Sequence, residues 1–226
     1  MKLLKKTVAA VISASMLFAM TSCSKIEQNY KREGAEWAIE AYKMLPAEFN
    51  EDTCNKFYMG GDVYEFPMKA GEFFDNGWEI IDIYQEDVDE NYPLDPGFMY
   101  EFCLDKNHDV AAMVWIFNDS DKAMPVSECT VIYFCIDWNE EALLPGGALL
   151  KSKYDSLEEG LAAYNEDMTE FDEEDMVYGY EFDVDGWNDN CSVRLDFGED
   201  QRGFTISTVK YYAVDPEILE LAKDSL

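Results

Sequence analysis

The chain of 226 residues has little positive charge and almost no histidine. It contains 17 Lys and Arg against 48 Asp and Glu, with one His, for a formal net charge of -31. Binding of DNA or RNA through phosphates needs clustered cations, so this balance argues against nucleic acid as a partner. A single histidine excludes metal sites built from several histidines. A hydrophobic content of 48% still predicts a packed core, because acidic disordered chains contain far less.

Recognisable catalytic motifs are absent as well. His108, the one histidine, lies in a Lys-Asn-His-Asp sequence typical of an exposed hairpin tip, a poor place for a Cys-His or Ser-His-Asp site. The glycine pairs Gly60-Gly61 and Gly146-Gly147 lack the Lys and Ser or Thr of a phosphate-binding loop. With 48 acids some carboxylates pair by chance, so glycosidase-type chemistry is neither indicated nor excluded. We expect a protein that is not an enzyme and has no cofactor, with an extracellular carboxylate-dependent hydrolase as the alternative.

The longest uncharged apolar run lies at the N-terminus. Three Lys in residues 1–6 precede Val8–Met20, which is too short to span a bilayer stably and is typical of a secretory signal peptide. Its end, Met20-Thr21-Ser22-Cys23, resembles the lipobox of bacterial lipoproteins, in which the cysteine becomes the lipidated N-terminus. Met20 departs from the Leu usual at that position. The alternative is an ordinary cleavable signal with an incidental cysteine.

The resemblance implies lipidation at Cys23 after removal of a signal peptide, residues 1–22. Two or more acyl chains suffice for stable anchoring, so the protein is expected at the outer face of the cytoplasmic membrane, behind a tether over residues 23–32. Cleavage removes three Lys and no acid, which takes the net charge from -31 to -34. An anionic lipid surface repels such a domain, so the only membrane contact expected is the lipid.

The remaining cysteines fit no zinc or CxxC spacing. Five is an odd number, so at least one thiol is unpaired in an extracytoplasmic protein; the five are Cys54, Cys103, Cys129, Cys135 and Cys191. The internal repeat described next matches three of them, Cys129, Cys135 and Cys191, with Ser or Ala. We therefore expect buried thiols that act as small hydrophobic side chains, with disulfide formation as the alternative.

Two parts of the chain resemble each other in sequence. The segment that begins Tyr100-Glu101-Phe102 aligns with Tyr180-Glu181-Phe182 at an offset of 80 residues. Residues 129–137 align with residues 207–215 at an offset of 78. The two glycine pairs stand before these segments. The sequence thus predicts two tandem units, over residues 57–144 and 145–226, after an N-terminal helix and linker at residues 33–56.

Each unit is expected to be a short helix followed by an antiparallel meander, which gives an α+β fold. The predicted helices are Lys69–Asn76, stopped by Gly77, and a segment capped at Asp155 and Ser156. The predicted strands cover residues 98–104, 110–117, 128–136, 177–184, 191–197 and 203–213. Apolar residues on both faces of Thr130–Ile136 indicate that the first sheet is covered on both sides, by the N-terminal helix, the other unit or a partner.

Two aspartates close the third strand of each unit and are interpreted as helix caps. Asp137 would cap a short helix ending before Pro145, and Asp215, followed by Pro216, an amphipathic C-terminal helix. A further helix is expected over Glu33–Leu45, packed on the first unit.

Calcium is the one metal ion worth weighing, because oxygen ligands are abundant. The densest group is Asp183, Asp185, Asn188 and Asp189. This segment fails the EF-hand pattern, since Ser192 stands where the bidentate Glu belongs, and it lies between predicted strands. A solvated hairpin is the preferred interpretation, and we expect no metal site; a calcium-dependent surface protein stays as an alternative.

Aromatic residues make up 15% of the chain, and most should be core. Any left exposed and rimmed by acids would suit a cationic or aromatic partner. The chain resembles the uncharacterised lipoproteins of Gram-positive anaerobes in its lipobox, its glycine pairs and the sequence motif Phe74-Asp75-Asn76-Gly77-Trp78. Helix plus meander is also similar to the fold of beta-lactamase-inhibitor-type and outer-membrane assembly lipoproteins. The fold resemblance implies a non-enzymatic interaction module, and we expect an unknown protein or cationic ligand as its partner.

Overall fold

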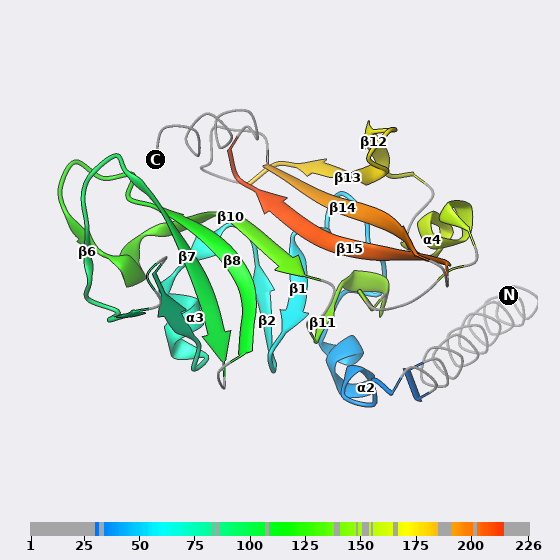
Figure 1. Ribbon diagram of the computed structural model, residues 1–226, viewed down its shortest axis with the longest axis horizontal. Helices are drawn as coiled ribbons and strands as arrows, with labels where there is room; N and C mark the ends of the chain where they lie inside the picture. Colours follow the sequence, from blue (N-terminus) through cyan, green and yellow to red (C-terminus); the bar gives the residue numbers. More distant parts are fainter. Residues whose placement is uncertain are drawn as a thin grey trace, which may run out of the picture.

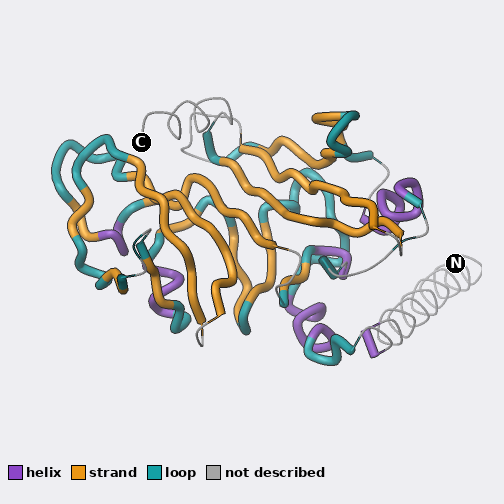
Figure 2. The backbone as a smooth tube through the Cα atoms, viewed as in Figure 1, coloured by secondary structure: helices purple, strands orange, loops and turns teal. Residues whose placement is uncertain are grey.

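The structure is a computed structural model in which helices and strands combine into an α+β fold dominated by antiparallel sheet. The residues that it describes are 30–31, 34–82, 84, 86–106, 109–137, 141–147, 149–150, 154, 156–164, 167–184, 191–200 and 203–214. The tube in Figure 2 shows the strands at the centre and the short helices around them.

Two three-stranded meanders form most of the main sheet. The first contains β7 (Met99–Lys106), β8 (Asp109–Phe117) and β10 (Thr130–Asp137), and the second contains β13 (Val177–Phe182), β14 (Cys191–Asp200) and β15 (Gly203–Tyr212). These six strands confirm the six segments predicted from alternating hydrophobicity, with ends that differ by a few residues.

The meanders join through their third strands. Strands β10 and β15 pair antiparallel, with Tyr133 opposite Tyr212 and Phe134 opposite Tyr211 (Figure 1). The sheet is therefore continuous, in the order β12-β13-β14-β15-β10-β8-β7-β4-β5.

Short strands complete the sheets. Four extend the main sheet at its ends or side: β12 (Thr169–Asp172), β4 (Glu79–Ile81) with β5 (Asp87–Val88), and β3 (Met68–Lys69), which pairs with β10. A second sheet contains β11 (Ala142–Leu143), β1 (Lys56–Met59) and β2 (Asp62–Glu65), and a third contains β6 (Pro93–Leu94) and β9 (Met124–Pro125). The hairpin between β1 and β2 turns at Gly60 and Gly61, whose φ angles are 59° and 112°.

Aromatic rings fill the space between the main sheet and the layer formed by β1, β2 and α3 (Gly71–Asp75). Phe134 of β10 stacks on Phe57 at 4.9 Å and on Phe73 at 5.7 Å between ring centroids. Tyr211 of β15 lies 5.0 Å from Phe57, so the same layer packs against both meanders. On the other face of β10, Tyr133 is only 5% exposed, but Cys135 is half-buried and Met113 of β8 is 37% exposed, so the predicted cover of the first sheet is incomplete on this face. Residues 57–75 cover the face of the main sheet that carries Phe134.

The helices predicted before each meander are present but short. Helix α4 (Leu157–Tyr164) begins as predicted, because the Ser156 hydroxyl accepts a hydrogen bond from the Glu159 amide at 3.2 Å. Helix α3 is followed by Gly77 at φ 76°, the left-handed conformation expected of a C-terminal stop.

Two helix predictions are wrong in detail. Ala142 and Leu143, expected in a helix after Asp137, form β11 and pair with Met59 and Tyr58 of β1. Pairing with a buried strand outweighs the local capping signal there. The helix expected over Glu33–Leu45 is reduced to α2 (Ala38–Ala41) and a 3-10 turn, η1 (Tyr42–Met44). The predicted C-terminal helix, with its cap Asp215, lies outside the described residues.

The N-terminal segment packs on the second sheet and on the turn that follows β11. Trp37 stacks on Tyr58 of β1 at 5.6 Å, and the Tyr30 hydroxyl donates to the Gly147 carbonyl at 2.6 Å. A turn, η3 (Pro145–Gly147), brings the second glycine pair to this contact. Within the described part of the chain, every helix is too short or too polar to cross a membrane.

Candidate binding surface

Most residues singled out in the sequence fall outside the described part of the chain. These are Cys23, His108, Asp185, Asn188 and Asp189. Asp183 follows β13 and is exposed. Among the described residues, no three His, Cys, Asp or Glu side chains gather closely enough to hold a metal ion.

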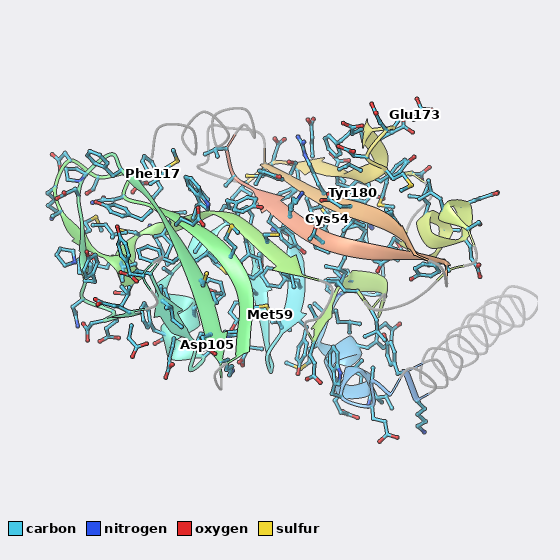
Figure 3. The ribbon with its side chains drawn as sticks, viewed as in Figure 1. Cys54, Met59, Asp105, Phe117, Glu173 and Tyr180 are labelled. Carbon is cyan, nitrogen blue, oxygen red and sulfur yellow. The ribbon has the colours of Figure 1, made fainter. Side chains whose placement is uncertain are left out.

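The five described cysteines are thiols at different depths. Cys54, Cys129 and Cys191 are buried, as expected of small hydrophobic side chains, whereas Cys103 and Cys135 are half-buried. Burial raises the pKa of the Cys54 thiol to about 12, with the nearby carboxylates of Glu51 and Asp52 adding to the shift. A thiol with such a pKa is protonated near neutral pH, so it is a poor nucleophile. Figure 3 shows Cys54 beneath the second meander, near Tyr180.

The strongest concentration of one charge lies between α3 and the end of β7. Residues 70–105 contain eleven Asp and Glu and no Lys, Arg or His. Within the described residues, none of the four ion pairs seen involves Asp or Glu of residues 82–101. The negative charges of these carboxylates are therefore not neutralised by ion pairs with neighbouring side chains.

The same segment carries the most exposed aromatic side chains of the described residues. Tyr84 is 78% exposed, Phe98 61% and Tyr92 49%. Together with the exposed acids they form what we term the acidic–aromatic surface, which consists of Tyr84, Glu86, Asp87, Asp89, Glu90, Tyr92, Asp95 and Phe98. These residues offer a partner both apolar area and negative charge.

Two aspartates fix the turns of this surface through hydrogen bonds to the backbone. The Asp82 carboxylate accepts from the amides of Tyr84 and Glu86 at 2.8 and 2.9 Å. The Asp89 carboxylate accepts from the Asn91 amide at 2.9 Å. These local bonds are typical of Asx turns and explain why a segment so rich in acid has a defined path.

Asn118 holds the far end of the surface. Its side chain is fully buried, and its amide group donates to the carbonyls of Leu94 at 2.8 Å and Lys122 at 2.9 Å. Its side-chain oxygen accepts from the amide and the hydroxyl of Ser120 at 3.0 and 2.7 Å. Its backbone bonds to Gly97 and Phe98. Asn118 thus ties the loop that carries Asp95 and Phe98 to the end of β8, near Phe117 in Figure 3.

A small cationic group lies on the second meander, opposite in sign to this surface. Arg194 of β14 stands directly across from Lys210 of β15, and its guanidinium lies 4.4 Å from the ring of Phe171 and 5.1 Å from that of Tyr212. Lys210 forms an ion pair with Asp196. The Arg194 Nε is buried without a hydrogen-bond partner. Stacking on both rings explains the position of the guanidinium in the sheet.

Sequence reasoning did not locate the acidic–aromatic surface, because it expected most aromatic residues in the core. The available signal was the absence of every basic residue between Lys69 and Lys106. Exposure of Tyr92 and Phe98 is a property of the fold and has no signature in local composition.

Comparison with known proteins gives no relative. No protein-family model, no curated protein and no solved structure matches the chain.

Proposed function

We propose that this protein is a lipid-anchored extracytoplasmic binding protein whose acidic–aromatic surface takes a cationic ligand. The observation that carries the proposal is the exposure of Tyr84, Tyr92 and Phe98 among five unpaired carboxylates. A cation gains from both features, since carboxylates attract its charge and the negative faces of aromatic rings attract it at close range.

The proposal implies modest affinity that depends on salt. One exposed ion pair contributes about 0.2–1 kcal/mol and one exposed cation–π contact about 0.5–1 kcal/mol, so several must act together. The net charge of -34 expected of the mature chain also steers cations toward the protein over long distances. Salt at 0.1 M largely screens charges that are more than about 10 Å apart, so both effects weaken as salt rises.

Titration of the mature chain, unlipidated through Cys23→Ala, tests this function. Spermine is the cationic probe and succinate the anionic one, with calorimetry at 20 mM and 500 mM NaCl. Saturable binding of spermine at low salt, weakened by Phe98→Ala and Tyr92→Ala, is expected. Met44→Ala is the matched control, because Met44 is 56% exposed and lies outside this surface. Equal binding of both probes, or binding that all three variants leave unchanged, contradicts the proposal.

The lipid anchor rests on the lipobox-like end of the apolar run and on Cys23. Labelling with palmitate in a bacterial host tests it directly. The wild-type chain should incorporate label and fractionate with membranes, whereas Cys23→Ala should lose the label. Label in both chains contradicts lipidation at this cysteine.

We also infer that the two meanders descend from one duplicated unit. Support comes from the repeated Tyr-Glu-Phe sequences and from the strand order, in which the two meanders meet at their third strands, β10 and β15.

A further inference from the structure

Strand β7 is paired along its whole length on one side but along only part of the other. Strand β4 pairs with Cys103, Leu104 and Asp105. Beyond Ile81 the chain turns away, since Asp82 bonds to the Tyr84 and Glu86 amides. Within the described residues, no strand continues opposite Met99–Phe102. This stretch is therefore an open sheet edge.

The hydrogen bonds at the start of β7 show which backbone groups face the open side. The Asn118 amide donates to the Phe98 carbonyl at 3.3 Å, which places Phe98 in a hydrogen-bonded pair with the end of β8. In an antiparallel ladder such pairs alternate, so the amides and carbonyls of Met99 and Glu101 point away from β8. The pairs Cys103–Ile81 and Asp105–Glu79 continue the same alternation on the β4 side. Two donors and two acceptors are left at the open edge.

Aromatic side chains line this edge on one face of the strand. Phe98, Tyr100 and Phe102 form a row, with centroids 6.4 Å apart for the first pair and 6.3 Å for the second. The row runs from the core, where Phe102 is 3% exposed, to the acidic–aromatic surface, where Phe98 is 61% exposed. The opposite face presents the Glu101 carboxylate, which is half-buried.

We propose that the cationic ligand is an extended peptide that adds to β7 as a strand along Met99–Phe102. This rests on the function proposed above and specifies its ligand. The backbone of the peptide supplies partners for the exposed amides and carbonyls, and its alternate side chains reach the aromatic row and the carboxylates. A segment without net positive charge lacks the attraction of the eleven acids in residues 70–105.

A second copy of this chain is a poor occupant of the same edge. Pairing of two β7 edges would place two acidic–aromatic surfaces side by side, and like charges directly opposite each other destabilise strand pairs. The charge pattern thus favours a basic peptide over self-association.

The test uses an acetylated and amidated hexapeptide of alternating Lys and Thr, together with the same peptide methylated on alternate backbone nitrogens. Both carry the same charge. The unmethylated peptide should bind the mature Cys23→Ala chain at least tenfold more tightly than the methylated one, whereas spermine, which has no backbone, binds without this requirement.

A matched pair of protein variants addresses the edge itself. Met99→Pro removes an amide that faces the open side and leaves the bonds to β8 intact, so the fold should persist, as for proline at edge strands. It should weaken hexapeptide binding at least tenfold and leave spermine binding unchanged. Met99→Ala should change neither. Urea denaturation of both variants verifies that they remain folded.

Each outcome is decisive. If spermine and hexapeptide both bind but methylation and Met99→Pro have no effect, strand addition is wrong while the cationic surface stands. If neither cationic probe binds, the proposed function fails as well. A concentration-dependent dimer in size-exclusion chromatography that Met99→Pro dissociates assigns the edge to a second copy and overturns the peptide proposal.

Discussion

Replacement of Asn118 by Ala should destabilise the protein far more than its place in a surface loop would indicate. The Leu94 carbonyl that it leaves is buried, and an unsatisfied buried acceptor costs about 1–3 kcal/mol. The bonds to Lys122 and Ser120 are only partly buried, so water replaces them and their loss adds about 1 kcal/mol in total. The expected loss is about 2–4 kcal/mol in the free energy of unfolding.

Urea and thermal denaturation measure this loss. For a domain of this size a change of 1 kcal/mol shifts the melting temperature by roughly 2–4 °C, so Asn118→Ala should melt roughly 5–15 °C below the wild type. Asn91→Ala is the control, because Asn91 lies in the same region but is exposed and bonds only to Asp89. It should change the stability by less than about 0.5 kcal/mol.

The same variant links stability to binding. Asn118 holds the loop that carries Asp95 and Phe98, so its loss should weaken spermine binding under conditions where the protein is still folded. Equal stability of Asn118→Ala and Asn91→Ala would refute the assignment of Asn118 as the buried tie between the two loops.

Three further predictions follow from buried groups. Gly179→Ala should destabilise by about 1–3 kcal/mol in urea denaturation, because a Cβ there would lie 1.9 Å from the Val193 carbonyl oxygen. Ionisation of Cys54 and Tyr64 should lower stability as pH rises from about 8 toward 12. Burial raises the pKa values of Cys54 and Tyr64 to about 12, so the unfolded chain loses these protons first; a flat urea midpoint from pH 9 to 11 would contradict this. Iodoacetamide should label half-buried Cys103 before buried Cys54 in the folded protein, as mass spectrometry of peptides would show.

The sequence predicts the six meander strands and the start of α4 because their signals are local. Alternation over Val177–Phe182 and the hydroxyl of Ser156 act within a few residues of the chain. The sequence predicts a helix where the structure has strand β11. Ala142 and Leu143 are extended because they pair with Met59 and Tyr58, which lie more than 80 residues earlier in the chain. Local capping cannot report such a partner.

The candidate surface was only partly predictable for the same reason. Composition reveals the acids of residues 70–105, but exposure of Phe98 depends on the Asn118 tie and on the end of β4 at Ile81. Phe98, Tyr100 and Phe102 alternate identically in the sequence, yet one is buried and one is exposed. Where a strand leaves the core is decided by its neighbours in the sheet.

The last strand that the structure describes occupies the middle of the sheet, and this constrains the order of folding. Until β15 is available, β10 has an open edge at Tyr133–Asp137, and Phe57 lacks its contact with Tyr211. A chain that emerges from its N-terminus therefore cannot close its core before nearly all of it has been synthesised. The position of β15 therefore delays closure of the sheet until late in synthesis. It also leaves a fragment that stops before β15 with a long unpaired edge and a tendency to aggregate.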